Sequence, residues 1–539
     1  MKFLRRWLIA ATLASGWAGF GLAGPADSAE VKLQLKGGGF EITGELKSYD
    51  GRQYMIDSKA LGTMSIDAAR FECIGGACPT APTVAPAGPT RRSAPIGDLG
   101  TTTWMGGSGI GTTFMPELIK SYAKLNGLLV TQSTGTDPRD LEFTLSRGSG
   151  NQIGRFIVKR HGVPPGYEGL RNGSVDLVWT SARMTEEEEA RFTSAGLRAM
   201  RVAGSEHVFA LDAMVMLVAR ENPAVSLSIE NIARIFAGQI SDWSEVGLPP
   251  GKINIYAPVD GMGLLIHFDN TILKPRGLKL AENAIRTKTA VEWSDRVAAD
   301  PAGIGMHFIS YIRNAKALNI ESSCGLITRP SQFTAKTEEF ALARRLYLYT
   351  MGEPKTPLAR ELLRHALSPQ IQEALKAADF VDQEPELLPF RDQGARIAYA
   401  LNAQSEDFDL NLMRQLITEV TAGSRFSTTL RFETSSSALD VKANQDVARL
   451  AQILRGPEFA DKTILLLGFA DAVGAFDANL KLSLKRAQAV QKALLASGQL
   501  DIPAGRLIVK GYGELAPVAC NDSIESRTLN RRVEVWVKN

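Results

Sequence analysis

The sequence predicts a multidomain protein that is mainly α/β, with a small N-terminal β module, a two-lobed α/β body and a C-terminal α/β domain. Three observations lead to this prediction. The chain has 539 residues, and a single hydrophobic core seldom grows beyond about 250 to 300 residues. A stretch rich in Pro, Ala and Thr separates short alternating strands from the rest of the chain. Beyond it, strand-like and helix-like pieces alternate, which is typical of α/β architecture.

Residues 1–29 have the layout of a secretory signal peptide. Lys2, Arg5 and Arg6 precede an apolar run from Trp7 to about Ala23, and small residues follow. The sequence therefore predicts an exported protein. An uncleaved N-terminal membrane anchor is the alternative, although the apolar run is short for a membrane span.

Residues 30–78 form the predicted β module. Short pieces such as VKLQL, FEITGEL and QYMIDS alternate apolar and polar residues and are separated by glycine-rich turns and by Asp50-Gly51. Such hairpin signals indicate a small all-β fold, which we expect to be SH3-like. The segment carries no set of catalytic side chains, so we interpret it as an interaction or spacer module.

The chain contains four cysteines. Cys73 and Cys78 are close in sequence, and in the oxidising compartment that an exported chain reaches we expect them to form a disulfide. Two free thiols are the alternative. A metal site is not expected, because no other Cys or His lies nearby. Cys324 and Cys520 fall in different predicted domains and are expected to be unpaired.

Residues 79–98 lack any hydrophobic period and are rich in Pro, Ala and Thr, which predicts a stiff, extended linker. The remaining predicted parts are an α/β body over 99–395, a helical connector over 396–426 and a C-terminal domain over 427–539. Residues 395–401 and 410–421 are amphipathic and predict two helices at the connector. Their apolar faces are expected to pack on a neighbouring domain.

Local patterns predict individual elements of the body. The apolar run Ala213–Ala219 predicts a strand, and Ile229–Ala237 has the spacing of a helix with Ser228 as its N-cap. A further helix is expected to begin near Pro116, after a glycine-rich turn.

The C-terminal domain contains the most distinctive stretch of the chain. The apolar run Thr463–Leu467 predicts a buried strand, and Asn479–Ser497 has helical spacing. Asp471 would then lie just past the end of a strand, and Arg486 two turns inside a helix. Two more strands are expected from Arg506 to Tyr512 and from Arg532 to Val537.

This stretch resembles the OmpA-like (OmpA/MotB C-terminal) peptidoglycan-binding domain. The family's loop Asp, its Asn, its Leu-Ser pair and its Arg-Ala pair are matched by Asp471, Asn479, Leu482-Ser483 and Arg486-Ala487. The family's closing signature is matched by Gly511-Tyr512-Gly513-Glu514, Pro517, Asn521, Arg527 and Asn530-Arg531-Arg532-Val533-Glu534. The resemblance covers about residues 427–539. One departure is Ala470, where the family usually has a small hydroxyl residue.

The resemblance implies a ligand, the diaminopimelate side chain of the peptidoglycan stem, which carries a carboxylate and an ammonium group. It assigns the ammonium to Asp471 and the carboxylate to Arg486, whose planar fork can bind a carboxylate bidentately. Asn479, Arg531 and Arg532 are candidates for support of the pocket. An isolated Asp and Arg would more commonly be a solvated surface pair. The surrounding motif favours the binding role here.

The body is similar to the periplasmic phosphate-binding proteins of ABC importers, which have the type 2 periplasmic-binding fold. The residues that carry this resemblance are Gly173–Leu177, Leu211-Asp212, Asn222-Pro223, Leu227–Gly247, Gly303–Met306 and Arg345–Thr350. Proteins of this fold hold an oxyanion with hydroxyl groups, backbone N–H groups at helix N-termini and an Arg.

Two loops of the body keep groups that suit an anion. The first, Gly106–Thr113, offers Ser108, Thr112 and Thr113. The second offers Ser181 and Arg183, with Ala182 where many relatives carry Arg. These five residues are the candidate anion ligands. Their alternative role is structural, as hydroxyls that cap helices and an Arg in a surface salt bridge.

The third anion loop departs from the family pattern. Pro258–Leu264 lacks an Arg and two hydroxyls and contains Asp260, and the family's His-Gly-Ser-like segment reads His161–Pro164 here. A hydrogen bond to a charged group contributes about 1.5 to 3 kcal/mol. The loss of three donors would remove several decades of affinity. The ligand of the body is therefore left open, as phosphate, another small anion or none.

Composition and motifs disfavour other classes. The formal net charge is +3, and no basic patch alternates with aromatic residues, so nucleic acid is not an expected partner. The five histidines have no metal-ligand spacing, and neither a P-loop nor a nucleophile elbow is present. We expect no enzyme activity, no metal and no cofactor.

Together these features predict a protein of the periplasm of a diderm bacterium, attached to peptidoglycan and associated with the outer membrane. One hypothesis is a wall-anchored substrate-binding protein for phosphate or a related small anion, which serves an ABC importer. The alternative is a structural or interaction protein whose body has lost its ligand and contacts an envelope protein.

Overall fold

The computed structural model describes residues 30–36, 41–49, 53–58, 62–68, 71–75, 78, 97–148, 150–402, 408–432, 436–497, 503 and 505–538. The predicted signal peptide and most of the predicted linker lie outside these ranges. The chain divides into two compact units, Met1–Ile96 and Gly97–Asn539. Within the described residues, no helix combines the length and the apolar character needed to cross a membrane.

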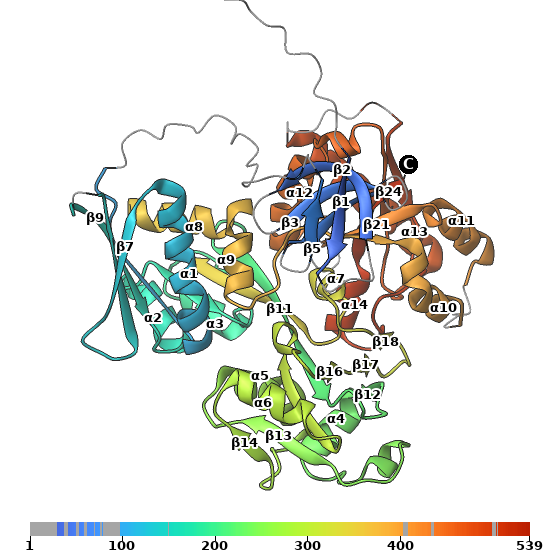
Figure 1. The fold of residues 1–539 in the computed structure, drawn as a ribbon, viewed down its shortest axis with the longest axis horizontal. Coiled ribbons are helices and arrows are strands. Elements are labelled where there is room, and N and C mark those ends of the chain that lie inside the picture. Colours follow the sequence, from blue (N-terminus) through green and yellow to red (C-terminus); the bar gives the residue numbers. More distant parts are fainter. Residues whose placement is uncertain are drawn as a thin grey trace, which may run out of the picture. The chain divides into compact units, whose positions relative to one another are not determined.

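The first unit contains a five-stranded antiparallel sheet in the order β4-β3-β2-β1-β5 (Figure 1). Its strands are β1 (Glu30–Leu35), β2 (Glu41–Tyr49), β3 (Gln53–Ser58), β4 (Gly62–Asp67) and β5 (Phe71–Ile74). Alternate residues point to one face, where Val31, Leu33 and Ile56 are buried. The predicted all-β character of this module is confirmed.

The first lobe of the body is built on a mixed sheet in the order β10-β6-β9-β8-β7. Its strands are β6 (Gly100–Gly106), β7 (Leu129–Thr134), β8 (Asp140–Ser146), β9 (Gln152–Lys159) and β10 (Leu177–Thr180). Its helices are α1 (Ser108–Asn126), α2 (Val163–Asn172), α3 (Glu186–Thr193), α8 (Pro357–Ala366) and α9 (Gln372–Ala377). Although α8 and α9 come late in the sequence, both pack beside α1 (Figure 1).

The second lobe is built on the strands β15, β13 and β14, which continue the same sheet. Its main elements are β13 (Asn254–Pro258), β14 (Ile285–Thr287), β15 (Gly303–Phe308), α4 (Ile229–Phe236), α5 (Gly263–Phe268) and α6 (Ala290–Ala298). Smaller elements are β12 (Ser226–Ser228), β16 (Lys316–Ala317), β17 (Asn319–Glu321), β18 (Ile327–Thr328) and α7 (Gln332–Lys336). As predicted, Ser228 caps α4 and accepts the N–H of Asn231 at 3.1 Å.

Two long strands join the lobes. β11 (Glu206–Val218) pairs with β19 (Ala343–Thr350) through its first half and with β15 through its second half. The burial of almost every residue of β11 explains why its sequence is a continuous apolar run rather than an alternating one. The predicted two-lobed α/β architecture is confirmed.

The C-terminal domain has a sheet in the order β20-β21-β24-β22-β23. Its strands are β20 (Leu387–Pro389), β21 (Gly423–Arg431), β22 (Thr463–Gly468), β23 (Leu507–Gly511) and β24 (Arg532–Lys538). Its helices are α10 (Gly394–Asn402), α11 (Leu410–Val420), α12 (Val441–Ile453), α13 (Phe476–Ala496) and α14 (Ile524–Asn530). Helices α12 and α13 cover one face, whereas α10 and α11 pack on the other. The two predicted connector helices therefore belong to this domain's core.

Two predicted helix starts were wrong. Helix α1 begins at Ser108 and contains Pro116, so the glycines expected in a turn lie in its first turns. A Cβ on Gly111 would come within 2.8 Å of Trp179, which is why glycine is needed there. Helix α13 begins at Phe476 rather than Asn479. Strand β21 spans Gly423–Arg431, on both sides of residue 427, where the C-terminal domain is predicted to begin.

The structure contains two disulfides. Cys73 is bonded to Cys78 (S–S 2.06 Å) and Cys324 to Cys520 (S–S 2.01 Å). The expectation that Cys324 and Cys520 are unpaired was wrong. Although the two cysteines belong to different domains, the turn between β17 and β18 reaches the loop before α14, because body and C-terminal domain pack together in one unit.

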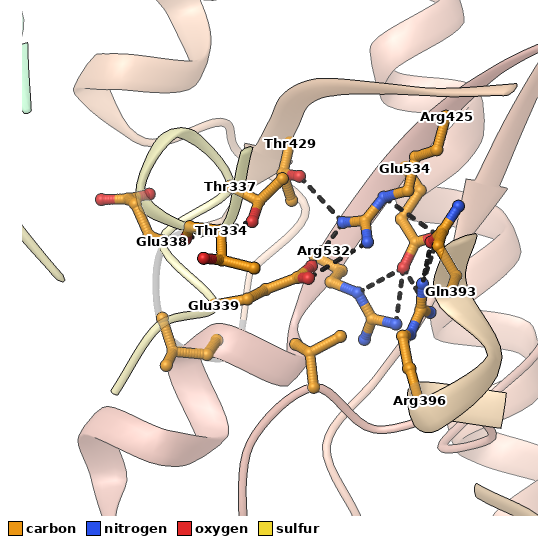
Figure 2. A network of polar contacts seen from close by, with 12 residues as sticks. Thr334, Thr337, Glu338, Glu339, Gln393, Arg396, Arg425, Thr429, Arg532 and Glu534 are labelled. Carbon is orange, nitrogen blue, oxygen red and sulfur yellow. Dashed lines mark hydrogen bonds and ion pairs between the residues drawn. The ribbon is translucent and has the colours of Figure 1, made fainter. Parts of the chain in front are cut away.

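A buried ion-pair cluster also joins the body to the C-terminal domain (Figure 2). Glu339, which follows α7, binds Arg425 of β21, and the neighbouring Glu338 binds Arg431 of the same strand at 3.0 Å. Within the domain, Glu534 accepts hydrogen bonds from Arg396 at 2.6 Å and from Arg532 at 2.8 Å (Figure 2). Charges that leave water are tolerated because each has partners of opposite sign.

Candidate functional site

The first candidate site lies in the C-terminal domain, where the loop after β22 meets the start of β24. Asp471 in this loop accepts a hydrogen bond from Nη1 of Arg531 at 2.8 Å through Oδ2. Its other oxygen, Oδ1, accepts the N–H of Val473 at 3.1 Å, which fixes the turn. Both charged side chains are largely covered, with exposed fractions of 13% for Asp471 and 6% for Arg531.

Arg486 projects from α13 toward the same region. Helix α13 can lie against β22 and β23 because both strands end in glycine: a Cβ on Gly468 would come within 2.0 Å of the carbonyl oxygen of Ser483, and one on Gly511 within 2.5 Å of Leu484 N. The close approach buries the α13 face that carries Asn479, Ser483 and Arg486. These three residues follow helical spacing and therefore line one stripe.

The environment of Arg486 suits a carboxylate ligand. Its Nη1 donates to the carbonyl of Phe469 and its Nε to that of Ser436, both at 3.4 Å, and the guanidinium lies 5.4 Å from the centre of the Phe432 ring. Burial, and then the charge of Arg531, lower the pKa of Arg486 to about 10, while Asp471 acts in the opposite direction. Among the described residues no carboxylate forms an ion pair with Arg486, so its charge is only weakly compensated.

The structure brings together three of the five residues assigned to this site. Asp471, Arg486 and Arg531 interact electrostatically. Asn479 lies two turns before Arg486 and donates to Glu514 at 2.9 Å. Arg532 points elsewhere: it is fully buried in the ion-pair cluster and lies 4.1 Å from the centre of the Phe469 ring. Its neighbours make it a structural residue of the domain core.

Several residues that support the Asp471 loop were not assigned a role from sequence. Asn521 accepts the N–H of Ala472 at 3.1 Å, and Thr528 accepts a hydrogen bond from Nη2 of Arg531 at 2.6 Å. Glu514 and Asn521 belong to the matched closing signature, which was a signal for their importance. Thr528 has no such signal, because its contact depends on how α14 places it.

The second candidate site is the first turns of α1 in the first lobe. Ser108 is exposed, Thr113 donates to the carbonyl of Gly109 at 3.1 Å, and Thr112 accepts a hydrogen bond from Nη1 of Arg160 at 3.1 Å. Arg160 also donates to the carbonyl of Pro138 at 2.8 Å. The guanidinium of Arg160 therefore lies beside the hydroxyls at the positive end of a helix, an arrangement that can hold an anion. Sequence analysis did not single out Arg160.

Arg183 is engaged elsewhere. Its Nε lies 3.1 and 2.9 Å from the two carboxylate oxygens of Glu206, which is 2% exposed and also accepts the hydroxyl of Tyr349 at 2.8 Å. Ser181 is half-buried two residues earlier. The charge of Arg183 is thus compensated by a buried carboxylate, so Arg183 would attract an anionic ligand less strongly than an unpaired arginine.

The third loop carries no visible replacement for the missing donors. Asp260 is 94% exposed and pairs with Arg286. A further charged pair that sequence analysis missed lies where the lobes join: Nη2 of Arg344 donates to Asp212 at 2.7 Å across the paired strands β11 and β19. Burial raises the pKa of Asp212, and the charge of Arg344 acts in the opposite direction. The two side chains therefore form a buried ion pair from which water is excluded.

Two family models match the chain. The PBP superfamily domain matches residues 158–370 and the OmpA family matches residues 431–531. This chain contains a PBP-superfamily domain and a C-terminal OmpA-family domain. The first covers the second lobe and the part of the first lobe that lies between β9 and α9, including β11 and β19, but not the start of α1. The second covers Asp471, Asn479, Arg486 and Arg531.

Individual relatives divide between the same two parts. A phosphate-binding protein PstS of Borreliella burgdorferi is 25% identical over 225 residues, which are 40% of this chain and 76% of the relative. A probable lipoprotein YiaD of Escherichia coli is 32% identical over 104 residues, which are 19% of this chain and 45% of the relative. The chain thus spans less than half of the second relative's length. Among solved structures, PstS from Borrelia burgdorferi covers 52% of this chain and 98% of its own, with a TM-score of 0.40 and 20% identity.

Proposed function

We propose that this protein is a peptidoglycan-anchored periplasmic binding protein whose PBP-superfamily body receives phosphate or a related small oxyanion. The observation that carries the anchoring part is the group formed by Asp471, Arg531 and Arg486. A buried guanidinium without an acidic partner among the described residues stands beside a carboxylate held in a fixed turn.

These two groups match an amino acid head group. The carboxylate of a diaminopimelate side chain would accept two parallel hydrogen bonds from Arg486 and offset its buried charge. The ammonium group would donate to Asp471, which has one oxygen on Arg531 and the other on a backbone N–H. Attachment to the wall would then keep the body at a fixed place in the envelope, from which it delivers its ligand to an ABC importer.

The test of anchoring is co-sedimentation of the full chain with purified sacculi. We expect the protein to pellet with sacculi and to be released by millimolar free diaminopimelate but not by the same concentration of 1,5-diaminopentane, which has both amines but no carboxylate for Arg486. A protein that stays in the supernatant, or that 1,5-diaminopentane releases equally, would contradict the assignment.

The test of the body is calorimetric titration of the full chain with phosphate, with sulfate as the control. The full chain is used because a disulfide and buried ion pairs join the body to the C-terminal domain. Saturable micromolar or tighter phosphate binding is expected, supported by the hydroxyls and Arg160 at the start of α1. Flat titrations of the folded protein would remove phosphate from the proposal.

A second candidate function is an anchored structural or interaction protein whose body has lost its ligand. Two contacts favour it: Arg183 is matched by buried Glu206, and exposed Asp260 occupies the third loop. In that case the body would present its surface to an envelope protein. Wall binding without phosphate binding is the combination of results that would select this function.

A further inference from the structure

The disulfide between Cys324 and Cys520 has one accessible end. Cys324 lies in a tight turn between β17 and β18, where the N–H of Gly325 donates to the carbonyl of Ser322 at 3.0 Å. Gly325 has a φ of +79°, a value that favours glycine, so the turn is well defined. Cys324 is exposed, whereas Cys520 is only 5% exposed. A thiol from outside can therefore reach the sulfur of Cys324 far more easily than that of Cys520.

An uncharged cavity of about 410 Å³ adjoins this sulfur. One wall is the turn from Cys324 to Ile327, and the other is formed by Ala395, Tyr399 and Asn402 of α10. The hydroxyl of Tyr399 donates to Sγ of Cys324 at 3.1 Å, so a residue of the α10 wall contacts the disulfide directly. Ile327 is 50% exposed and offers apolar surface beside it. None of the residues that line the cavity is charged, so an uncharged surface of a partner would fit it better than a charged ligand.

One hydrogen-bond donor contacts the sulfur of Cys520. Its Sγ accepts the backbone N–H of Cys324 at 3.2 Å, whereas the hydroxyl of Ser323, 3.6 Å away, donates to the carboxylate of Asp522. Donors directed at a sulfur favour the thiolate over the thiol. In thiol–disulfide exchange, a leaving thiol with a lower pKa departs faster. Cys324 accepts a comparable hydrogen bond from Tyr399, so hydrogen bonding does not distinguish the two sulfurs. Attack at Cys324 with departure of Cys520 is favoured by access, because Cys324 is exposed and Cys520 is buried.

We propose that Cys324–Cys520 is a thiol–disulfide exchange site for a dithiol protein that docks in this cavity. The partner's thiolate attacks Sγ of Cys324, the S–S bond breaks, and Cys520 leaves as a thiolate that takes up a proton. The partner's second thiol then attacks the mixed disulfide and releases Cys324, which is also protonated. Two electrons and two protons pass to this chain, and the partner becomes a disulfide.

Reduction would change how the C-terminal domain is held. With the disulfide cut, the domain is still tied to the body by the ion pair of Glu339 with Arg425 (Figure 2) and by that of Glu338 with Arg431. The exchange thus converts a covalent connection into one that can open. This inference goes beyond the proposed function and requires neither peptidoglycan nor phosphate to bind.

The test uses the full chain, purified without reductant, and reduced thioredoxin as the dithiol protein. Thiols are trapped by alkylation and counted by peptide mass spectrometry. We expect Cys324 and Cys520 to become alkylated at least tenfold faster with thioredoxin than with glutathione at equal thiol concentration. Cys73–Cys78, in the same molecule, serves as the internal reference. Equal rates with the two reductants would overturn the proposal.

A thioredoxin variant without its second cysteine identifies the attacked sulfur, because it stops at the mixed disulfide. We expect the adduct on Cys324, and an adduct mainly on Cys520 would contradict the mechanism. Ile327→Asp should slow the thioredoxin reaction at least tenfold and leave the reaction with dithiothreitol unchanged. Val225→Asp, at an exposed apolar residue outside the cavity lining, is the matched control and should behave like the unmodified chain. An unchanged thioredoxin rate in Ile327→Asp would rule out docking in the cavity.

Discussion

Glu339 of the body and Arg425 of the C-terminal domain form an ion pair in which both terminal nitrogens of Arg425 donate to the two carboxylate oxygens of Glu339. Arg425 is fully buried, and its Nε lies 3.4 Å from Glu534. Burial alone would raise the pKa of Glu339, but Arg425 and Arg396 outweigh it and hold the pKa below its usual value. The carboxylate is therefore charged when the two parts are packed together.

Glu339→Gln should destabilise the protein strongly. It leaves three guanidinium groups, of the buried Arg425 and Arg532 and the partly buried Arg396, against the single carboxylate of Glu534. Breaking a buried ion pair on one side costs about 3 to 5 kcal/mol. Scanning calorimetry should show a clearly lower unfolding temperature. The double variant Glu339→Met, Arg425→Met should recover most of this loss, because it removes both charges together.

The control for this experiment is Glu187→Gln, which removes an exposed i,i+4 pair with Arg191. Exposed pairs contribute little to stability, so its unfolding temperature should not change measurably. If Glu339→Gln were as stable as Glu187→Gln, the contact between body and C-terminal domain would not hold in solution.

Asp471→Asn and Arg486→Lys should each weaken sedimentation with sacculi at least tenfold. A hydrogen bond to a charged group contributes about 1.5 to 3 kcal/mol, and lysine cannot reproduce the bidentate fork of arginine. Asp477→Asn, at an exposed acid near the start of α13, is the control and should sediment normally. Circular dichroism should confirm that all three variants are folded. Retention of full wall binding by both site variants would exclude this location for the ligand.

The sequence was sufficient where the signal was local. The apolar spacing of α4 and its cap Ser228 are set by neighbouring residues, and the helix formed as predicted. The start of α13 was misplaced because its N-cap residue, Ala475, makes no side-chain capping bond and so leaves no mark in the sequence. Likewise, the glycines of α1 read as a turn, whereas Gly111 is required by the close approach of Trp179 and Arg160.

For the candidate site and the contacts between domains, too, the sequence identified residues within a local motif and missed those whose partners are distant in sequence. Asp471 and Arg486 could be found because a motif surrounds them. The pairing of Cys324 with Cys520, separated by 196 residues, depends on the packing of two domains and has no local signal. Glu338 and Glu339 are similar, since two adjacent acids in a sequence resemble a solvated turn until Arg431 and Arg425 cover them. The engagement of Arg183 by Glu206 was hidden for the same reason.

The stability of the protein should fall on acidification from pH 6.5 to 5, partly because of His207. Burial lowers the pKa of His207 to about 4. In this range the unfolded chain takes up a proton at this histidine and the folded chain does not, so the free energy of unfolding decreases as the pH falls. The slope for one such group approaches about 1.4 kcal/mol per pH unit. His207→Gln should reduce the slope in urea unfolding, and equal slopes would contradict a neutral, buried His207.

The last prediction separates the two arginines near the candidate anion site. Arg160→Met keeps the apolar stem that packs on Gly111 but removes the guanidinium that donates to Thr112. It should weaken phosphate binding at least tenfold in a calorimetric titration, with little change in unfolding temperature. Arg183→Met should leave phosphate binding nearly unchanged and lower the unfolding temperature, because it leaves Glu206 buried without its cation. A loss of about 1 to 3 kcal/mol in stability is expected there, less than for a fully buried pair because Arg183 is partly exposed.

Arg191→Met, on the exposed face of α3, is the matched control and should change neither quantity. The comparison has a definite reverse outcome. If Arg183→Met abolished phosphate binding while Arg160→Met bound normally, the loop after β10, rather than the start of α1, would bind the anion. Glu206 would then have to release Arg183 when the ligand arrives, and the folded protein should become measurably more stable in phosphate than in sulfate.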